Sequence, residues 1–180
     1  MKKPQIAVIG SAGPEEYPHK KPLDAMFSAA RQIGEQLAQQ QCIVVCGGKG
    51  GIMEAVSAGA KAYGGTTVGE IAGDDRFAGN DYIDVEVVTT DVGFRGPSLL
   101  IGMSDVIISL GGGAGTLQEL AVAYRMKKPI ILLKGYGGWT DRITTKYLDE
   151  RKLVPFIITH RPEKAVQLAV NVAQGLIDAT

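Results

Sequence analysis

The sequence predicts an α/β protein with a Rossmann-like, doubly wound parallel sheet and helices on both faces, in one domain over residues 1–180. Three observations carry this prediction. Short apolar segments alternate with segments of helical periodicity from one end of the chain to the other. The apolar segments lack in-out alternation, which indicates strands covered by helices on both faces. Glycine-rich turns follow two of the strands, at the end where such sheets hold their ligands.

The first half of the chain begins with a short apolar strand, and a loop containing Pro and Glu then leads to Lys21. Apolar residues recur at helical spacing from Leu23 to Leu37. Gly64-Gly65 ends the next helix as a C-cap. The other elements expected here are the strands Gln5–Ile9, Ile43–Cys46, Thr66–Ile71 and Ile83–Val88, the helix Ile52–Tyr63 and a surface loop over Gly73–Asp81.

The second half repeats the alternation. A helix starts near Phe94, and the glycine-rich stretch Gly135–Trp139 is expected to be a flexible turn at the edge of the sheet. The remaining expected elements are the strands Asp105–Leu110, Pro129–Leu133 and Pro155–Thr159, the helices Thr116–Met126 and Ile143–Glu150, and a last amphipathic helix from Pro162.

Composition narrows the class of protein. Lys plus Arg equals Asp plus Glu, 19 against 19, so no global field recruits nucleic acid or membrane. The start of the chain lacks a signal-peptide pattern, and no run of 18 apolar residues occurs, so we expect a cytoplasmic protein. Glycine is enriched, with 24 of 180 residues.

The two cysteines and two histidines point to no metal site. Cys42 and Cys46 lie four residues apart on one expected strand, so their Cα atoms are about 13 Å apart, too far for a disulfide. We expect buried thiols. His19 and His160 fall in different loops and are not expected to be catalytic.

The most informative segment is the glycine-rich turn Gly111–Gly115, which the apolar run Val106–Ile108 precedes and a helical pattern follows. Such a turn aims backbone N–H groups and the positive end of a helix dipole at one point, which suits a phosphate. A second turn, Gly47–Gly51, lies between the strand Ile43–Cys46 and a helix from Ile52. Both turns are expected at the carboxyl ends of the strands.

Two common nucleotide motifs are excluded. A P-loop needs Lys followed by Ser or Thr, but Lys49 is followed by Gly50. In the dinucleotide fingerprint G-x-G-x-x-G, the third glycine position falls on Gln118, and the second strand ends in Cys46 rather than an acid. An NAD-dependent or ATP-hydrolysing function is therefore poorly supported.

What remains is the pattern G-G-x-G-T-x-x-E over Gly112–Glu119. Two further segments accompany this pattern: the turn Gly47–Met53 and the residues Lys127–Pro129 before the next strand. On these three features the chain resembles the LOG (Lonely Guy) family of phosphoribohydrolases, whose members are often labelled "putative lysine decarboxylase". The resemblance runs from the first strand through Leu133. The label itself is rejected, because no lysine is placed to form a Schiff base with pyridoxal phosphate.

Three departures make the chain more similar to the branch of this superfamily that includes molybdenum cofactor carrier proteins. LOG enzymes have proline where this chain has Gly111 and an Arg-Lys pair where Arg95 is followed by Gly96-Pro97. They have glycine after the equivalent of Met53, where this chain has Glu54.

The resemblance implies a nucleoside 5′-monophosphate with its phosphate on the amides of Gly112–Thr116 and the Thr116 hydroxyl as a further donor. Glu119 would stabilise an oxocarbenium-like sugar or activate water, and Arg95 would orient the nucleotide. A homodimer through the helices around residues 94–126 is implied too. The catalytic candidates are Glu119 and Arg95, and the ligand-binding candidates are Gly48, Lys49, Gly50, Gly51, Gly111, Gly112, Gly113, Ala114, Gly115 and Thr116; no metal and no cofactor is expected.

Structural explanations stand beside these functional ones. Thr116–Glu119 also fits a capping box, in which the two side chains satisfy helix-start amides. Lys49 also fits a solvated loop lysine, and Glu54 an acid that complements a helix dipole. Two functions follow: a phosphoribohydrolase that releases a free base, or a non-catalytic carrier of a phosphate-bearing pterin or nucleotide. A nucleic-acid partner is disfavoured by the zero net charge.

Overall fold

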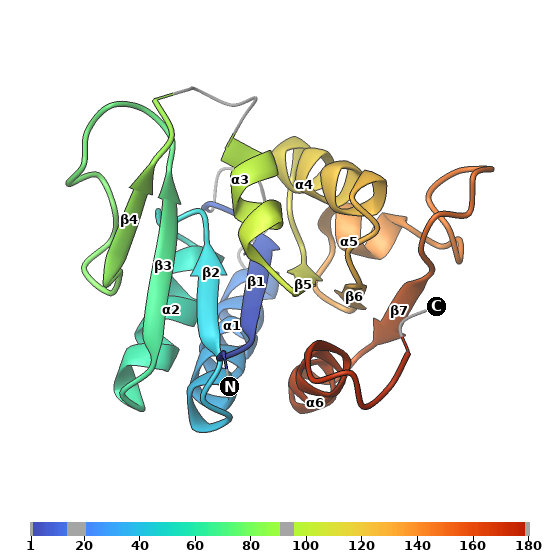
Figure 1. The fold of residues 1–180 in the computed structure, drawn as a ribbon, viewed down its shortest axis with the longest axis horizontal. Coiled ribbons are helices and arrows are strands. Elements are labelled where there is room, and N and C mark those ends of the chain that lie inside the picture. Colours follow the sequence, from blue (N-terminus) through green and yellow to red (C-terminus); the bar gives the residue numbers. More distant parts are fainter. Residues whose placement is uncertain (1, 14–20, 91–95, 179–180) are drawn as a thin grey trace.

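The computed structural model describes residues 2–13, 21–90 and 96–178, and these form one seven-stranded sheet in the order β4-β3-β2-β1-β5-β6-β7. All six strand pairings are parallel, and the order runs from left to right in Figure 1. The strands are β1 (Gln5–Gly10), β2 (Ile43–Cys46), β3 (Thr66–Ile71), β4 (Val85–Val88), β5 (Val106–Leu110), β6 (Ile130–Leu133) and β7 (Phe156–Thr159). The helices are α1 (Lys21–Gln39), α2 (Ile52–Ala62), α3 (Gly96–Met103), α4 (Ala114–Arg125), α5 (Gly138–Arg142) and α6 (Pro162–Ala173). The predicted doubly wound parallel fold is confirmed.

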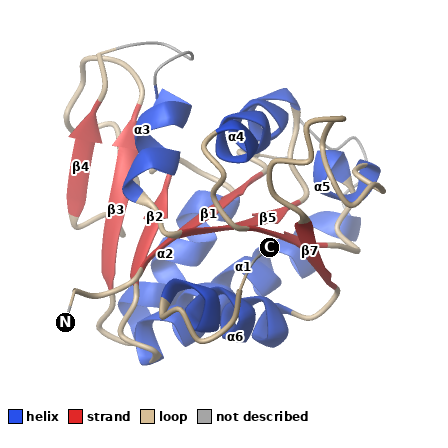
Figure 2. Cartoon of the chain, turned by 45° about the vertical axis from the view of Figure 1, so that its right-hand side comes forward, coloured by secondary structure: helices blue, strands red, loops and turns tan. Residues whose placement is uncertain are grey.

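Helices cover both faces of the sheet. Figure 2 shows α1, α2 and α6 on one side and α3 and α4 on the other. Each layer has its own apolar core, because successive residues of one strand face opposite sides. Ile6 and Val8 of β1 pack with the α1, α2 and α6 layer, whereas Ala7 and Ile9 pack with the α3 and α4 layer.

The winding reverses at the centre of the sheet. β1 pairs with β2 on one side and with β5 on the other, with Ile6 opposite Val106 and Gly10 opposite Leu110. The connections after β1 and after β5 therefore leave the sheet toward opposite faces, and a crevice opens between them at the carboxyl ends. This is the place where the sequence predicted a ligand.

The α1–α2 crossing depends on two glycines. A Cβ atom on Gly34 would collide with the Val56 carbonyl oxygen, and one on Gly59 would collide with the Arg31 carbonyl oxygen. Each helix thus lies directly against the backbone of the other. The close approach packs α2 firmly against α1 on this face of the sheet.

One predicted element is wrong. The sequence predicted a helix at Ile143–Glu150, but the structure places α5 earlier, at Gly138–Arg142. The Asp141 carboxylate accepts hydrogen bonds from the Gly135 and Gly137 amides, at 2.9 and 2.8 Å, so the stretch expected to be flexible is instead a structured helix start. Lys134 Nζ donates to the carbonyls of Asp141 and Ile143, which ends the helix there.

Among the described residues, no helix is both long enough and apolar enough to cross a membrane.

Replacing Gly34 by alanine is expected to lower the free energy of unfolding by about 1–3 kcal/mol, because overpacking a close contact has this cost. Gly102→Ala is the matched control in a helix, since a Cβ atom there lies 3.8 Å from its nearest neighbour, Met126 Cε. Alanine at that position should be neutral or stabilising by up to about 1 kcal/mol. Urea unfolding followed by circular dichroism measures both variants, and equal stabilities would contradict the prediction.

Candidate functional site

A pocket of about 230 Å³ lies at the carboxyl ends of the central strands, and we call it the switch-point pocket. One wall comes from α4, the opposite wall from the end of β3 and the start of α3, and the remaining residues from the end of β1 and the start of α2. Its lining residues are Gly10, Ala12, Met53, Glu70, Ala72, Gly96, Pro97, Gly115, Thr116, Gln118 and Glu119.

The turn after β5 is held by α5. The Gly111 carbonyl accepts hydrogen bonds from the Thr140 amide at 3.1 Å and its hydroxyl at 2.8 Å, and the Gly112 carbonyl accepts one from the Trp139 amide at 2.9 Å. Buried Thr140 also bonds to Ser109 at the end of β5, at 2.7 Å. These bonds occupy the carbonyls of the turn and fix where α4 starts.

Two glycines of this turn are required by the backbone. Gly111 has φ 63° and Gly112 has φ 90°, a region that L side chains rarely adopt. Proline, with φ near −65°, does not fit the conformation of Gly111, which gives the departure from the LOG pattern a structural reason. A Cβ atom on Gly112 would also collide with the Thr116 side chain.

The capping-box explanation of Thr116–Glu119 is wrong. α4 begins at Ala114 with Gly113 as its N-cap, and no side chain caps it by a hydrogen bond. Thr116 is therefore inside the first turn, buried beneath Gly112, rather than at the cap position. Glu119 is half-buried one turn further along α4 and lines the pocket.

The turn after β2 has a different arrangement. Asn80 holds it in place, since its side-chain amide donates to the carbonyls of Gly48 and Lys49, at 3.1 and 2.7 Å. Gly48 and Gly51 both have φ 69°, and a Cβ atom on Gly51 would meet the Ser11 and Ala12 backbone at about 2.5–2.6 Å. These glycines allow α2 to approach β1.

The predicted residues thus separate into three groups. Gly115, Thr116 and Glu119 line the switch-point pocket, while Gly111–Gly113 shape its turn and Ala114 is exposed at the first residue of α4. Lys49 and Gly50 line a neighbouring hollow of about 250 Å³ with Glu54. Gly48 and Gly51 have backbone functions. Arg95 and His19 lie outside the described residues.

The cysteine prediction is confirmed. Cys42 and Cys46 are free and buried. Burial, with a smaller contribution from the Asp105 carboxylate, raises the pKa of Cys42 to about 11. Burial likewise raises the pKa of the Cys46 thiol, whose sulfur accepts the Gly48 amide at 3.4 Å and so tethers the turn after β2. Within the ranges 2–13, 21–90 and 96–178, no cluster of three His, Cys, Asp or Glu side chains is arranged to hold a metal ion.

The sequence reasoning missed Glu70. This residue lies near the end of β3, is 7% exposed and lines the pocket opposite α4. Thr89 Oγ1 donates to its Oε1 at 2.8 Å. Burial raises the pKa of Glu70, while the Thr89 bond and the charge of Lys49 act in the opposite direction. The sequence feature that could have identified Glu70 is that it is the single charged residue in the strand Thr66–Ile71.

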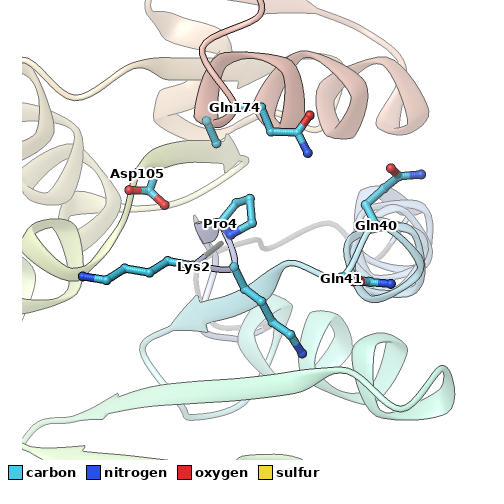
Figure 3. A pocket seen from close by; sticks show the side chains of 8 residues that line it. Lys2, Pro4, Gln40, Gln41, Asp105 and Gln174 are labelled. Atoms are coloured by element: carbon cyan, nitrogen blue, oxygen red, sulfur yellow. The ribbon is translucent and has the colours of Figure 1, made fainter.

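A larger hollow, of about 700 Å³, lies at the amino ends of the strands, between Lys2 and Pro4, Gln40 and Gln41, Asp105, and Gln174 (Figure 3). The helices α1 and α6 end beside it, at Gln39 and Ala173. Lys2 and Lys3 bring positive charge to this hollow, but the helix C-termini beside it carry partial negative charge and exposed carbonyls and offer a phosphate no helix-start amides. The chemistry favours the smaller pocket.

Comparisons with known proteins agree with this fold and place the chain among relatives. The model of the SLOG cluster4 family matches residues 3–166. The structure of TM1055, a structural-genomics target, is similar with a TM-score of 0.84 and 38% identity, over 92% of this chain and 97% of that one.

Two further similar structures have named ligands. The molybdenum cofactor binding protein of Rippkaea orientalis has a TM-score of 0.76 and 29% identity, over 93% of this chain and 96% of that one. The molybdenum cofactor carrier protein of Chlamydomonas reinhardtii has a TM-score of 0.78 and 27% identity, over 96% of this chain and 99% of that one.

We expect Glu70→Gln to raise the Tm at about pH 7.5 and to leave it nearly unchanged at about pH 4. The raised pKa means that the folded chain holds this proton more tightly than the unfolded chain does. The stability from Glu70 is therefore fully present below the unfolded pKa of about 4.3 and is lost as pH rises through the folded pKa. Glutamine imitates the protonated acid at every pH.

Thermal unfolding at both pH values measures this effect. Glu150→Gln, at an exposed position, controls for the loss of one carboxylate. A lower Tm for Glu70→Gln at about pH 7.5 would contradict the prediction.

Proposed function

The chain belongs to the SLOG cluster4 family, and from that premise we propose that it is a carrier of a phosphate-bearing small molecule, with molybdenum cofactor as its cargo. That cofactor joins a pterin ring to a phosphate. Two similar structures, at 27% and 29% identity over nearly the whole chain, are molybdenum cofactor proteins. The same pocket chemistry also suits a nucleotide.

The start of α4 carries the proposal. Its N-cap, Gly113, provides no side-chain hydrogen bond, and the carbonyls of the preceding turn are bonded to Trp139 and Thr140. Gly115 lines the pocket without a Cβ atom, and a Cβ atom there would have nothing within 4 Å. Backbone amides and the positive end of the helix dipole thus face open space, as an anion requires.

The partners and the compartment stay predictions. The predicted dimer surface around residues 94–126 exposes Leu99 and Met126, each 45% exposed, which favours a homodimer through α3 and α4. A cytoplasmic location and the lack of a nucleic-acid partner rest on the sequence alone.

Replacing Gly115 by aspartate is expected to weaken GMP binding by at least about tenfold, since a carboxylate placed at the α4 start repels a phosphate dianion. The substitution should keep the fold, because the space is open and an acid complements a helix start. Isothermal titration calorimetry measures the dissociation constant of GMP, with guanosine as the ligand that lacks phosphate.

Gln167→Asp adds the same charge at an exposed position of α6, on the other face of the sheet, and should leave GMP binding unchanged. The proposed function fails if GMP and guanosine bind the native protein equally, or if both aspartate variants bind GMP like the native protein.

A second candidate, phosphoribohydrolase activity, is favoured by one observation: Glu119 lines the pocket one helical turn from Gly115 and Thr116. A carboxylate there would face the sugar of a nucleotide whose phosphate occupies the helix start.

Native protein incubated with a panel of nucleoside 5′-monophosphates is then expected to release one free base, and Glu119→Gln to lower that rate by about 10²–10⁴-fold with binding retained. Chromatography of the free base measures both. No release from the folded native protein across the panel would eliminate this candidate and leave the carrier.

A further inference from the structure

We propose that Glu70 recognises the amino-pyrimidinone edge that pterin and guanine share, and so selects which ring enters the switch-point pocket. The proposal rests on the proposed function for the phosphate end of the ligand, and it assigns the other end. Glu70 lies on the wall opposite the start of α4, where the phosphate is proposed to bind. The residue would therefore contact the ring of the ligand and determine which ring is accepted.

The position of Glu70 is unusual for a carboxylate. The residue is 7% exposed, and the pocket is where it meets open space. Within the described part of the chain, its carboxylate accepts one hydrogen bond, from Thr89 Oγ1 to Oε1 at 2.8 Å. A buried carboxylate has four acceptor positions, so it retains capacity for donors from a ligand.

Thr89 and Gly96 contact this carboxylate from two sides. A Cβ atom on Gly96 would collide with Oε1 and lie 2.9 Å from Oε2. α3 therefore begins directly against the carboxylate, and its first residue, a glycine, leaves room for the carboxylate in this position. The Thr89 bond on one oxygen and the α3 backbone beside both restrict the orientations of the carboxylate, which reduces the entropy lost on binding.

The two walls of the pocket have opposite chemistry. The α4 wall offers amide donors and a helix dipole, which attract phosphate. The β3 wall offers a buried acceptor, which attracts N–H groups and repels phosphate. Met53, which also lines the pocket, offers a thioether, which makes favourable contacts with flat aromatic rings. A ligand with a phosphate at one end and a ring with N–H donors at the other matches this polarity.

The ring edge follows from hydrogen-bond matching. Pterin and guanine each present a ring N–H beside an exocyclic amino group, two parallel donors that a carboxylate accepts together. Lumazine replaces the amino group of pterin by a carbonyl, and hypoxanthine lacks the amino group of guanine. Each analogue therefore loses one of the two bonds, and lumazine also sets an oxygen against the carboxylate.

The test compares ligands that differ only at this edge. Native protein is titrated with pterin and with lumazine, and binding is followed by ligand fluorescence. We expect pterin to bind at least about tenfold more tightly, the effect of one charge-assisted hydrogen bond. Equal affinities, or binding of neither ring, would overturn the proposal.

Glu70→Gln gives the decisive variant. A glutamine amide offers one acceptor and one donor, which match the N–H and the carbonyl of lumazine better than the two donors of pterin. The ratio of pterin to lumazine affinity is expected to fall to about threefold or less, while the affinity for inorganic phosphate stays unchanged. A ratio that remains at its native value would overturn the assignment of Glu70.

Glu86→Gln is the matched control. Glu86 lies on the adjacent strand β4, accepts the Gly79 amide at 3.1 Å, and is absent from the pocket lining. This variant should keep the native preference for pterin over lumazine. If that preference were lost here as well, the proposal would be overturned, because any acid in this region would then produce the preference.

A second pair of ligands shows whether the pocket takes the amino-pyrimidinone edge from pterin alone or from guanine as well. GMP and IMP carry the same phosphate and differ by the amino group. Preference for pterin over lumazine without preference for GMP over IMP identifies the pterin as the ring that fits, and preference in both pairs identifies the shared edge. The proposed function is judged separately, by whether GMP binds more tightly than guanosine.

Discussion

The parallel pairing of β1 with β5 is the constraint on which the rest of the site depends. It brings the end of the first strand beside the end of the fifth, with Gly10 opposite Leu110, and the two following connections diverge to opposite faces. Gly10 itself tolerates no side chain, because a Cβ atom there would collide with the Leu110 carbonyl and with Ile52. The pocket exists because these two strand ends lie this close while their helices separate.

The two helix starts at this edge are both positioned by backbone bonds from elsewhere in the chain. The Ile52 amide at the start of α2 donates to the Ser11 carbonyl after β1, and the turn before α4 is bonded to Thr140 and Trp139 of α5. Positive φ angles at Gly51, Gly111 and Gly112 permit both arrangements. At these three positions, glycine is needed to place the backbone that forms the two helix starts.

Hydrophobic periodicity was sufficient to predict the sheet, because every central strand is buried on both faces and its apolar run is continuous. Hydrophobic periodicity was insufficient to predict α5. Asp141 and Lys134 define the ends of that helix through side-chain hydrogen bonds to the backbone, and a pattern of apolar residues carries no information on such bonds. The pattern Thr-x-x-Glu at Thr116–Glu119 also fitted a capping box, whereas the structure starts the helix earlier, after a turn whose Gly111 and Gly112 carbonyls are bonded to α5. Glu70 was missed because its meaning depends on Gly96, which only the folded chain brings against it.

The order of groups across the pocket relates the two candidate functions to one another. If the phosphate binds at the start of α4 and the ring at Glu70, as proposed, Glu119, one turn along α4, would face the part of the ligand that joins them. In a nucleotide that part is a ribose with a glycosidic bond, which a carboxylate there can help to break. In a pterin cofactor the ring has no such bond, and the same carboxylate has nothing to cleave. On these two proposals carriage and hydrolysis would use the same pocket residues, and the chemistry of the ligand's linker would decide between them.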